Sequence, residues 1–177
     1  MNNWIKNMLY PSLIYTGIIG GIYILNNLVV DAFNLPFSIY NQVSANLILI
    51  AGIVIAIYAY RKEYNNNLIS YGRAVGFGAL TALLVGIILS IYTNIYIQYI
   101  NPDFVALLKQ NLEEKFLQKG FSPDMIETIT SRTDRMQKPL IVFARTIFST
   151  EVLGVIVSLI ASIFIKKEPS EPFADVA

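Results

Sequence analysis

The sequence predicts an all-α integral membrane protein with four transmembrane helices, and three observations support this prediction. Of the 177 residues, 55% are hydrophobic and only 14% are charged, whereas a soluble domain carries about 25% charged residues. The apolar residues gather in four runs long enough to cross a bilayer, which takes roughly 20 residues. Basic side chains cluster in the short segment between the second and third runs, as expected for a loop that stays in the cytoplasm during insertion.

The composition excludes several classes of chemistry. The chain contains no cysteine and no histidine, which excludes disulfides, Cys/His zinc sites and catalysis by a histidine acid or base. The formal net charge is +1, so no basic surface for nucleic acid is expected. The sequence shows no catalytic constellation, no calcium loop and no phosphate-binding glycine motif. We therefore expect no enzymatic activity, no cofactor, no metal site and no known small-molecule substrate.

The first two spans are predicted over residues 10–30 and 46–60. The first apolar run is long and lacks a small-residue cleavage site after it, which favours a retained helix over a cleaved signal peptide. Residues 31–45 contain no Lys or Arg and are broken by Pro36. We expect this segment to lie outside the cytoplasm.

Three basic side chains, Arg61, Lys62 and Arg73, lie between the second span and the third, which is predicted over residues 74–99. We interpret them as topology signals that hold the loop in the cytoplasm. Contact with anionic lipid is the alternative, although such a site usually needs about four to eight basic charges.

Residues 101–138 form a polar segment with six Lys/Arg and six Asp/Glu, a balance that is compatible with export. Asn101-Pro102-Asp103 predicts the start of a helix, with Asn101 as N-cap. Gly120 predicts a left-handed C-cap, with Phe121 in the accompanying apolar contact, and Ser122-Pro123 predicts a second helix start. The segment is therefore predicted to be an extracytoplasmic amphipathic hairpin that rests on the membrane or on itself, or that binds a partner.

The fourth span is predicted over residues 139–165, and Lys166-Lys167 marks its cytoplasmic end. Residues 1–167 are thus one membrane domain, and residues 168–177 are predicted to be a disordered cytoplasmic tail. Both termini are then in the cytoplasm, in a multi-pass protein of the cytoplasmic (inner) membrane.

Small residues at four-residue spacing predict close contact between the third and fourth spans, because helices in lipid approach best where side chains are small. The two stripes are Gly78, Ala82, Gly86 and Ser90 on the third span, and Thr150, Gly154 and Ser158 on the fourth. We expect packing within one chain, with a homodimer contact as the alternative.

Glu151 is the main candidate for a functional residue, since it lies close to the bilayer midplane, where an ionisable side chain costs about 3 kcal/mol. Arg145 is the nearest opposite charge in the same span, but it lies roughly 9 Å away along the axis and about 120° around it. The two cannot pair within the helix, and we expect Arg145 to reach the outer interface. Glu151 then needs a partner on another span. The candidates are Thr16, Asn26, Asn27, Tyr92, Asn94 and Tyr96.

We favour a structural role for Glu151, as a protonated or hydrogen-bonded group that fixes helix register. The alternatives are a proton- or cation-coupled site, or contact with another membrane protein. The leading hypothesis for function is a non-enzymatic accessory protein whose partners are membrane lipid and another membrane protein or a second copy. A small homo-oligomeric transporter or channel lined by Glu151 is the second hypothesis, and an enzyme acting on lipid at the interface is the third.

Residues 61–78, Arg-Lys-Glu-Tyr-Asn-Asn-Asn-Leu-Ile-Ser-Tyr-Gly-Arg-Ala-Val-Gly-Phe-Gly, resemble the signature of a membrane protein family typical of Bacteroidota. The family is catalogued as domain-of-unknown-function family 4199. Residues 96–104 look like its second signature, and the resemblance covers nearly the whole chain except the tail. It implies an integral membrane protein of about four spans, with no established activity and thus no functional residues to transfer.

Overall fold

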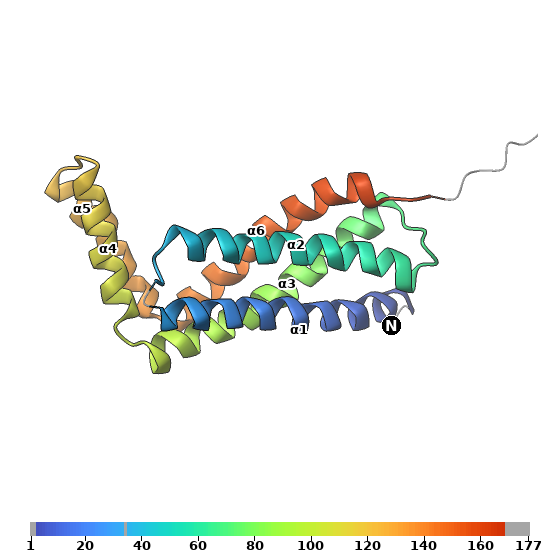
Figure 1. Ribbon diagram of the computed structural model, residues 1–177, viewed down its shortest axis with the longest axis horizontal. Helices are drawn as coiled ribbons and strands as arrows, with labels where there is room; N and C mark the ends of the chain where they lie inside the picture. The colour runs from blue at the N-terminus through green and yellow to red at the C-terminus, as the bar shows by residue number, and fades with distance from the viewer. Residues whose placement is uncertain (1–2, 34, 169–177) are drawn as a thin grey trace, which may run out of the picture.

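Four long helices run along the molecule in a computed structural model that describes residues 3–33 and 35–168 (Figure 1). They are α1 (Asn3–Ala32), α2 (Ile39–Tyr64), α3 (Tyr71–Ile95) and α6 (Pro139–Ile165). Within the described ranges there is no β-strand, and these four helices are long and apolar enough to cross a membrane. The predicted all-α class with four spans is confirmed. Of the predicted tail, residues 169–177 lie outside the described part.

The first two helices extend beyond the predicted spans at the ends that face each other. α1 continues to Ala32, so Asp31 is helical. α2 begins at Ile39 instead of Asn46, and the backbone N–H of Asn41 donates a 3.2 Å hydrogen bond to Oγ of the N-cap residue Ser38. The first turns of α2 carry polar side chains. A span predicted from a continuous run of apolar residues therefore begins too late.

The segment between α3 and α6 is a helical hairpin, as predicted. α3 continues into a π-helical turn (Tyr96–Ile100), which is followed by α4 (Phe104–Gln118), α5 (Pro123–Thr130) and a 3-10 helix (Ser131–Gln137). In Figure 1, α4 and α5 project from one end of the bundle at an angle to the long helices.

The junction between α4 and α5 confirms the predicted C-cap. Gly120 has a φ of +79°, a conformation that glycine adopts at no steric cost. The backbone N–H of Phe121 donates to the carbonyl of Phe116 at 3.1 Å, and the two rings lie 5.2 Å apart. The predicted start of α4 is wrong by a few residues. Asp103 is the N-cap and makes no side-chain capping bond, and the Asn101 side chain donates to the Tyr96 hydroxyl instead.

Small residues let α3 and α6 approach closely along most of their length. A β-carbon built at Gly154 would collide with that of Ala82, and one built at Gly78 would collide with Ser158. At Gly86 it would lie 3.3 Å from the Cα of Ile147. α3 also contacts α1 and α2 and so occupies the centre of the bundle, whereas α2 bridges α1 and α6.

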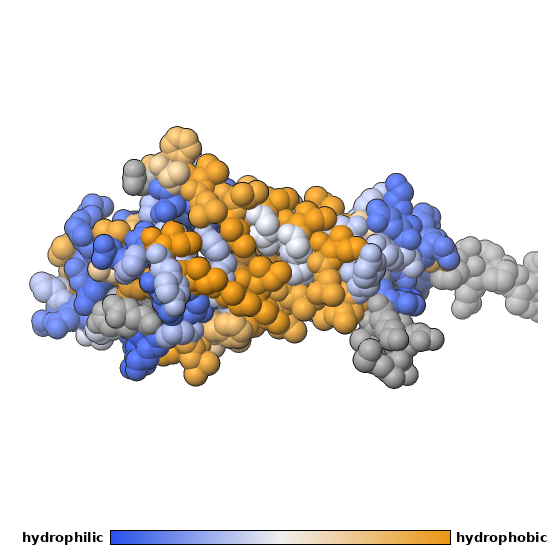
Figure 2. All heavy atoms as spheres, turned by 90° about the horizontal axis from the view of Figure 1, so that it is seen from below, coloured by the Kyte–Doolittle hydropathy of each residue, from blue (hydrophilic) through white to orange (hydrophobic). Residues whose placement is uncertain are grey.

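The molecule has two polar ends separated by a broad hydrophobic band (Figure 2). We call the end with the hairpin the hairpin end. The opposite end, where α1 begins, α2 connects to α3 and α6 stops, is the terminal end. α6 has 27 residues, so it is about 40 Å long, which matches a bilayer with its headgroup layers. The chain is a multi-pass membrane protein.

Candidate functional site

A polar cavity of about 290 Å³ opens at the hairpin end, where α1, α6 and α3 with its π-helical turn meet the α1–α2 connection, the start of α2 and α4. We call it the hairpin-end cavity. Its described lining residues are Tyr23, Asn27, Asp31, Pro36, Asn41, Tyr92, Thr93, Tyr96, Phe104, Leu108, Val142, Arg145, Thr146 and Ser149. These side chains come from α1, the α1–α2 connection, α2, α3, the π-helical turn, α4 and α6, so only the assembled bundle creates the cavity.

Helical periodicity explains how each long helix supplies its part of the wall. Tyr23, Asn27 and Asp31 follow one another at four-residue spacing and therefore lie on one face of α1. Tyr92 and Tyr96 have the same spacing on the central helix. On α6, a matching row runs from Val142 through Arg145 and Thr146 to Ser149. The cavity forms where these three faces meet.

Asp31 is held by a short hydrogen bond. The hydroxyl of Tyr96 donates to Asp31 Oδ1 at 2.6 Å, and Tyr96 in turn accepts from the Asn101 side chain at 3.2 Å. Tyr96 is only 8% exposed, and its ring packs edge-on against Phe104 at 5.4 Å. The carboxylate thus has a fixed position at the end of α1, because its donor belongs to the packed interior.

Tyr92 differs from Tyr96 in its hydrogen bonding. Its hydroxyl is buried and has no hydrogen-bond partner in the described part of the chain, although the residue lines the cavity. A buried polar group without a partner costs roughly 1–3 kcal/mol. The Tyr92 hydroxyl is therefore enclosed by the protein beside the cavity, where it lowers the stability of the fold.

Two amides complete the polar wall. The Asn41 side chain donates to the Pro36 carbonyl at 2.9 Å, and the Asn27 side chain donates to the Tyr23 carbonyl at 3.0 Å. Asn26 donates a longer bond, 3.5 Å, to Asn41 Oδ1. The Asn41–Pro36 bond holds the α1–α2 connection to the start of α2, and the Asn26–Asn41 bond joins α2 to α1.

Glu151 lies away from this cavity. It is roughly 18 Å along α6 from Pro139 and about 21 Å from Ile165, which places it near the middle of the helix. It is partly buried, and its Oε2 atom is buried without a hydrogen-bond partner among the described residues. The expected hydrogen bond from another helix is therefore wrong for this oxygen. Among the expected partners, the polar oxygens of Thr16, Tyr92 and Asn94 also lack partners there.

Arg145 and Glu151, the two ionisable candidates on α6, occupy different environments. Arg145 is exposed and lines the hairpin-end cavity, whereas Glu151 is not among the lining residues. Thr150, Gly154 and Ser158 face α3 on a third side of the same helix. The structure therefore separates the two charges that the sequence placed in one span.

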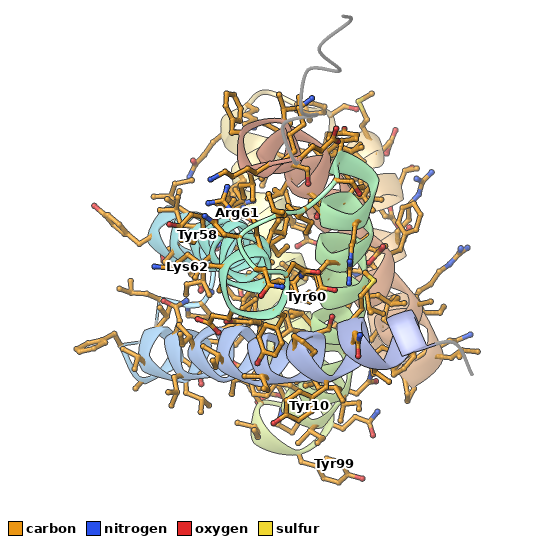
Figure 3. All side chains as sticks on the ribbon, turned by 90° about the vertical axis from the view of Figure 1, so that its right-hand side faces the viewer. Tyr10, Tyr58, Tyr60, Arg61, Lys62 and Tyr99 are labelled. Carbon is orange, nitrogen blue, oxygen red and sulfur yellow. The ribbon has the colours of Figure 1, made fainter. Side chains whose placement is uncertain are left out.

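The basic residues at the terminal end make specific contacts, and Figure 3 looks onto this end. Arg61 Nη1 donates to the carbonyl of Ile165 at 2.8 Å, and its guanidinium lies 4.9 Å from the centre of the Tyr58 ring. Arg73 Nη2 donates to the Tyr60 hydroxyl at 3.3 Å. Lys62 is exposed. Arg61 lies in the last turn of α2 and caps the last turn of α6, a role that the predicted basic loop did not reveal.

The α2–α3 connection is also fixed to the end of α6 by backbone. Ile69 and Lys167 exchange two hydrogen bonds of 2.8 and 2.9 Å. Asn66 and Asn67 have positive φ values of 49° and 62°, which asparagine tolerates better than most residues. The Asn65-Asn66-Asn67 run therefore makes a tight turn that brings Ile69 to Lys167.

The family model described as a protein of unknown function, DUF4199, matches residues 14–167. The chain belongs to this family. The match covers α2, α3, α6 and the hairpin in full and α1 from residue 14 onward, including every described residue of the hairpin-end cavity. No curated protein and no solved structure matches the chain.

Sequence reasoning missed Asp31 and Asn41 as site residues, and it linked Asn27, Tyr92 and Tyr96 to Glu151 instead of to one another. A usable signal was present, since polar residues recur at i, i+4 and i+8 on the last turns of α1. The cavity offers one carboxylate and one guanidinium together with phenol and amide groups. Among the described residues, no three Asp or Glu side chains gather as metal ligands would. The arrangement can bind a small polar group through charges and hydrogen bonds.

Proposed function

We propose that this membrane protein is a non-enzymatic accessory protein that acts through helix–helix contact with another membrane protein or with a second copy of itself. The observation that carries the proposal is the state of Glu151. Its Oε2 atom is buried near the middle of a membrane-spanning helix and has no hydrogen-bond partner in the described chain. Glu151 as a whole is only partly buried, so a donor from a second protein would approach the part of its side chain that stays exposed.

The exposure of the neighbouring residues supports an approach from outside the bundle. Phe148 is 71% exposed and Val152 is 43% exposed, and they lie one turn before Glu151 and directly after it. A helix that packs against this side of α6 would cover apolar side chains and meet the Glu151 carboxyl. Polar groups that bond across helices stabilise association in lipid by about 0.6–2 kcal/mol each.

The small-residue stripes are already packed within one chain. A partner helix would therefore contact α6 through the side that carries Glu151. Gly78, Gly86 and Gly154 are already in close contact within one chain. A partner helix could not use this surface without displacing α3 or α6. The side of α6 that carries Glu151 is still available.

The proposed location is the cytoplasmic membrane, with the terminal end and both termini in the cytoplasm. Arg61, Lys62, Arg73, Lys166 and Lys167 gather at the terminal end. Loops rich in Lys and Arg are retained in the cytoplasm. The hairpin, with balanced charge, would then lie on the outer surface.

The alternative is a small homo-oligomeric transporter or channel in which Glu151 forms an intramembrane proton or cation site. Glu151 does not line the hairpin-end cavity, so this alternative needs a path formed between copies. It predicts that Glu151→Gln abolishes flux in liposomes while fold and expression persist.

The test is photo-crosslinking in the membrane, with a photoreactive amino acid at Phe148 in wild type and in Glu151→Gln. A matched control carries the same group at Ile160, which is 57% exposed on the same helix but lines an apolar groove against α2. We expect a stoichiometric crosslink to one membrane protein from position 148, lost in Glu151→Gln and absent from position 160. A crosslink to a second copy alone, lost in Glu151→Gln, would establish self-association through Glu151, and flux assays in liposomes would then separate the accessory role from the transporter alternative.

A third result would overturn the interaction proposal altogether. If position 148 yields no product, or the same products as position 160 in both backgrounds, Glu151 makes no specific contact. The carboxyl would then have only the register-fixing role within the fold.

A further inference from the structure

An apolar groove lies between α2 and α6 in the half of the bundle next to the terminal end. We call it the α2–α6 groove. Ile50 and Val54 line it on α2, and on α6 a row of side chains lines it that begins at Leu153 and ends at Ile165. We propose that this groove holds one acyl chain of an anionic phospholipid, whose phosphate is bound by Arg61 and by the lysines that follow α6. The site goes beyond the proposed contact with a partner protein and does not depend on it.

The α2–α6 groove and Glu151 lie on opposite sides of α6. Ile160 lines the groove and follows Glu151 by nine residues, which corresponds to about 180° around the helix. A partner protein that reaches Glu151 therefore leaves the groove open. Each of the two sites can be lost without the other.

The volume of the groove suits a hydrocarbon chain and not a helix. It measures about 510 Å³, and every described residue that lines it is apolar. A helix about 10 Å across would need roughly 1,400 Å³ to fill a length of about 18 Å. An unbranched acyl chain is thin enough for the groove and brings no polar group into it.

The position of the groove along α6 matches the depth of an acyl chain in one leaflet. Leu153 lies near the middle of α6 and Ile165 is its last residue, and they are roughly 18 Å apart along the axis. The hydrocarbon layer of one leaflet is about 15 Å thick. The groove therefore runs from the middle of the bilayer to the headgroup layer at the terminal end. A chain that fills it brings its phosphate to this end of the groove.

Arg61 is fixed at the end of the groove where this phosphate would lie. Its Nη1 donates to the carbonyl of Ile165 at 2.8 Å, and the guanidinium lies 4.9 Å from the centre of the Tyr58 ring. In Figure 3, Arg61 extends from α2 toward α6. Its Nε is buried, but its Nη2 makes no hydrogen bond within the described chain, and the residue is partly exposed. A guanidinium matches the geometry of a phosphate, so Nη2 is available as a donor to it.

Two lysines add positive charge beside Arg61. Lys166 and Lys167 follow Ile165 directly, and both are exposed. Each Lys or Arg near a membrane surface increases affinity for anionic lipid about fivefold. A site that depends on charge alone needs about four to eight such residues. Here the groove supplies affinity for the acyl chain, and the three cations select the headgroup.

The nearby acidic residues do not cancel this charge. Glu168 follows the two lysines and is exposed, so it offsets one of the three cations. Glu63 is directed to the other side of α2, where its Oε2 accepts from the Tyr15 hydroxyl of α1 at 3.3 Å. The end of the groove therefore keeps a positive charge, which favours an anionic headgroup over a zwitterionic one.

The binding test uses the full chain purified in one detergent and records the shift in melting temperature with added lipid. Dioctanoyl phosphatidylglycerol and dioctanoyl phosphatidylcholine share acyl chains and differ in net charge. Glycerophosphoglycerol lacks the acyl chains, and dioctanoylglycerol lacks the phosphate. We expect phosphatidylglycerol to bind at least about fivefold more tightly than phosphatidylcholine. The two fragments should bind at least about tenfold more weakly than phosphatidylglycerol, because each engages one part of the site only.

Charge variants should remove the preference for the anionic lipid. The double variant Lys166→Gln/Lys167→Gln should weaken phosphatidylglycerol at least about fivefold and leave phosphatidylcholine within about twofold. Arg61→Gln should do the same, and the lysine variant serves if the loss of the α6 cap unfolds Arg61→Gln. Lys62→Gln is the matched control, because it removes an exposed cation about 100° further around α2. It should change the affinity for phosphatidylglycerol by less than about twofold.

A variant that fills the groove tests the acyl-chain part of the site. Ile160→Trp should weaken both lipids at least about fivefold without changing their order, because the larger side chain occupies the place of the acyl chain. Ile163→Trp is the matched control. Ile163 is 56% exposed on the same helix and does not line the groove, so this variant should bind both lipids like wild type.

Four results would overturn the proposal. They are equal affinity of wild type for the two lipids, a preference for phosphatidylglycerol that survives in both charge variants, equally tight binding of glycerophosphoglycerol, and unchanged lipid binding by Ile160→Trp. If Ile160→Trp also converts a dimer to a monomer while its lipid affinity stays at the wild-type value, the groove is an interface between two copies instead.

Discussion

Gly154 of α6 and Ala82 of α3 lie so close that a β-carbon on the glycine would clash with the β-carbon of the alanine. This contact, near the middle of the two most tightly packed helices, is possible because one of the pair has no side chain. It brings α6 against α3, which also packs on α1, and so helps to place the α6 wall of the hairpin-end cavity.

Gly154→Ala should destabilise the protein by about 1–3 kcal/mol, because the added methyl group forces the two helices apart. The free energy of unfolding, measured by titration with SDS in mixed micelles, tests this. Gly21→Ala is the matched control, since no atom lies within 4 Å of a β-carbon there; we expect no loss, or a gain of up to about 1 kcal/mol. The double variant Ala82→Gly/Gly154→Ala exchanges the two residues and should recover most of the loss. A Gly154→Ala protein as stable as wild type would show that the helices do not pack this closely.

Arg61→Gln should reduce stability by about 1–2 kcal/mol, since the Ile165 carbonyl loses a charged donor at 2.8 Å. Amide hydrogen exchange at Ile69 and Lys167 should accelerate, because their backbone bonds follow directly after the last turn of α6. Lys62→Gln removes the same charge from an exposed neighbour and should leave exchange unchanged. Equal effects of the two substitutions would mean that Arg61 acts only through its charge.

Tyr96→Phe should cost about 1.5–3 kcal/mol of unfolding free energy, because the hydroxyl bonds to the Asp31 carboxylate at 2.6 Å and accepts from Asn101. Tyr99→Phe is the comparison, as Tyr99 is 78% exposed and should tolerate the change. Thermal melting in one detergent ranks the two variants. If both proteins melted at the wild-type temperature, the hydrogen bond between Tyr96 and Asp31 would contribute nothing to the stability of the fold.

The proposed topology predicts opposite labelling of the two ends. The chain has no native cysteine, so Asn66→Cys in the α2–α3 connection and Gln118→Cys at the end of α4 each introduce a single thiol. In intact spheroplasts, a membrane-impermeant maleimide should label position 118 and not position 66, because basic loops stay in the cytoplasm. After permeabilisation both should react. The reverse pattern would place the hairpin in the cytoplasm.

The sequence by itself determined the features that depend on local composition. Long apolar runs predicted four spans, since each must satisfy its own backbone hydrogen bonds in lipid. Gly120 and Pro123 predicted a helix end and a helix start, because their backbone preferences act whatever surrounds them. The start of α2 was not predicted, because the polar turns around Asn41 resemble a loop when hydropathy alone is considered.

Tertiary structure alone decided which polar groups meet. Asp31 and Tyr96 are 65 residues apart, and nothing local links them to each other or to Arg145. Glu151 and Arg145 belong to one span, but the helix directs only Arg145 toward the cavity. The physical reason is that these pairings depend on the rotation and crossing of whole helices. Packing of small residues such as Gly154 against Ala82 sets that geometry, and it cannot be calculated from any one helix alone.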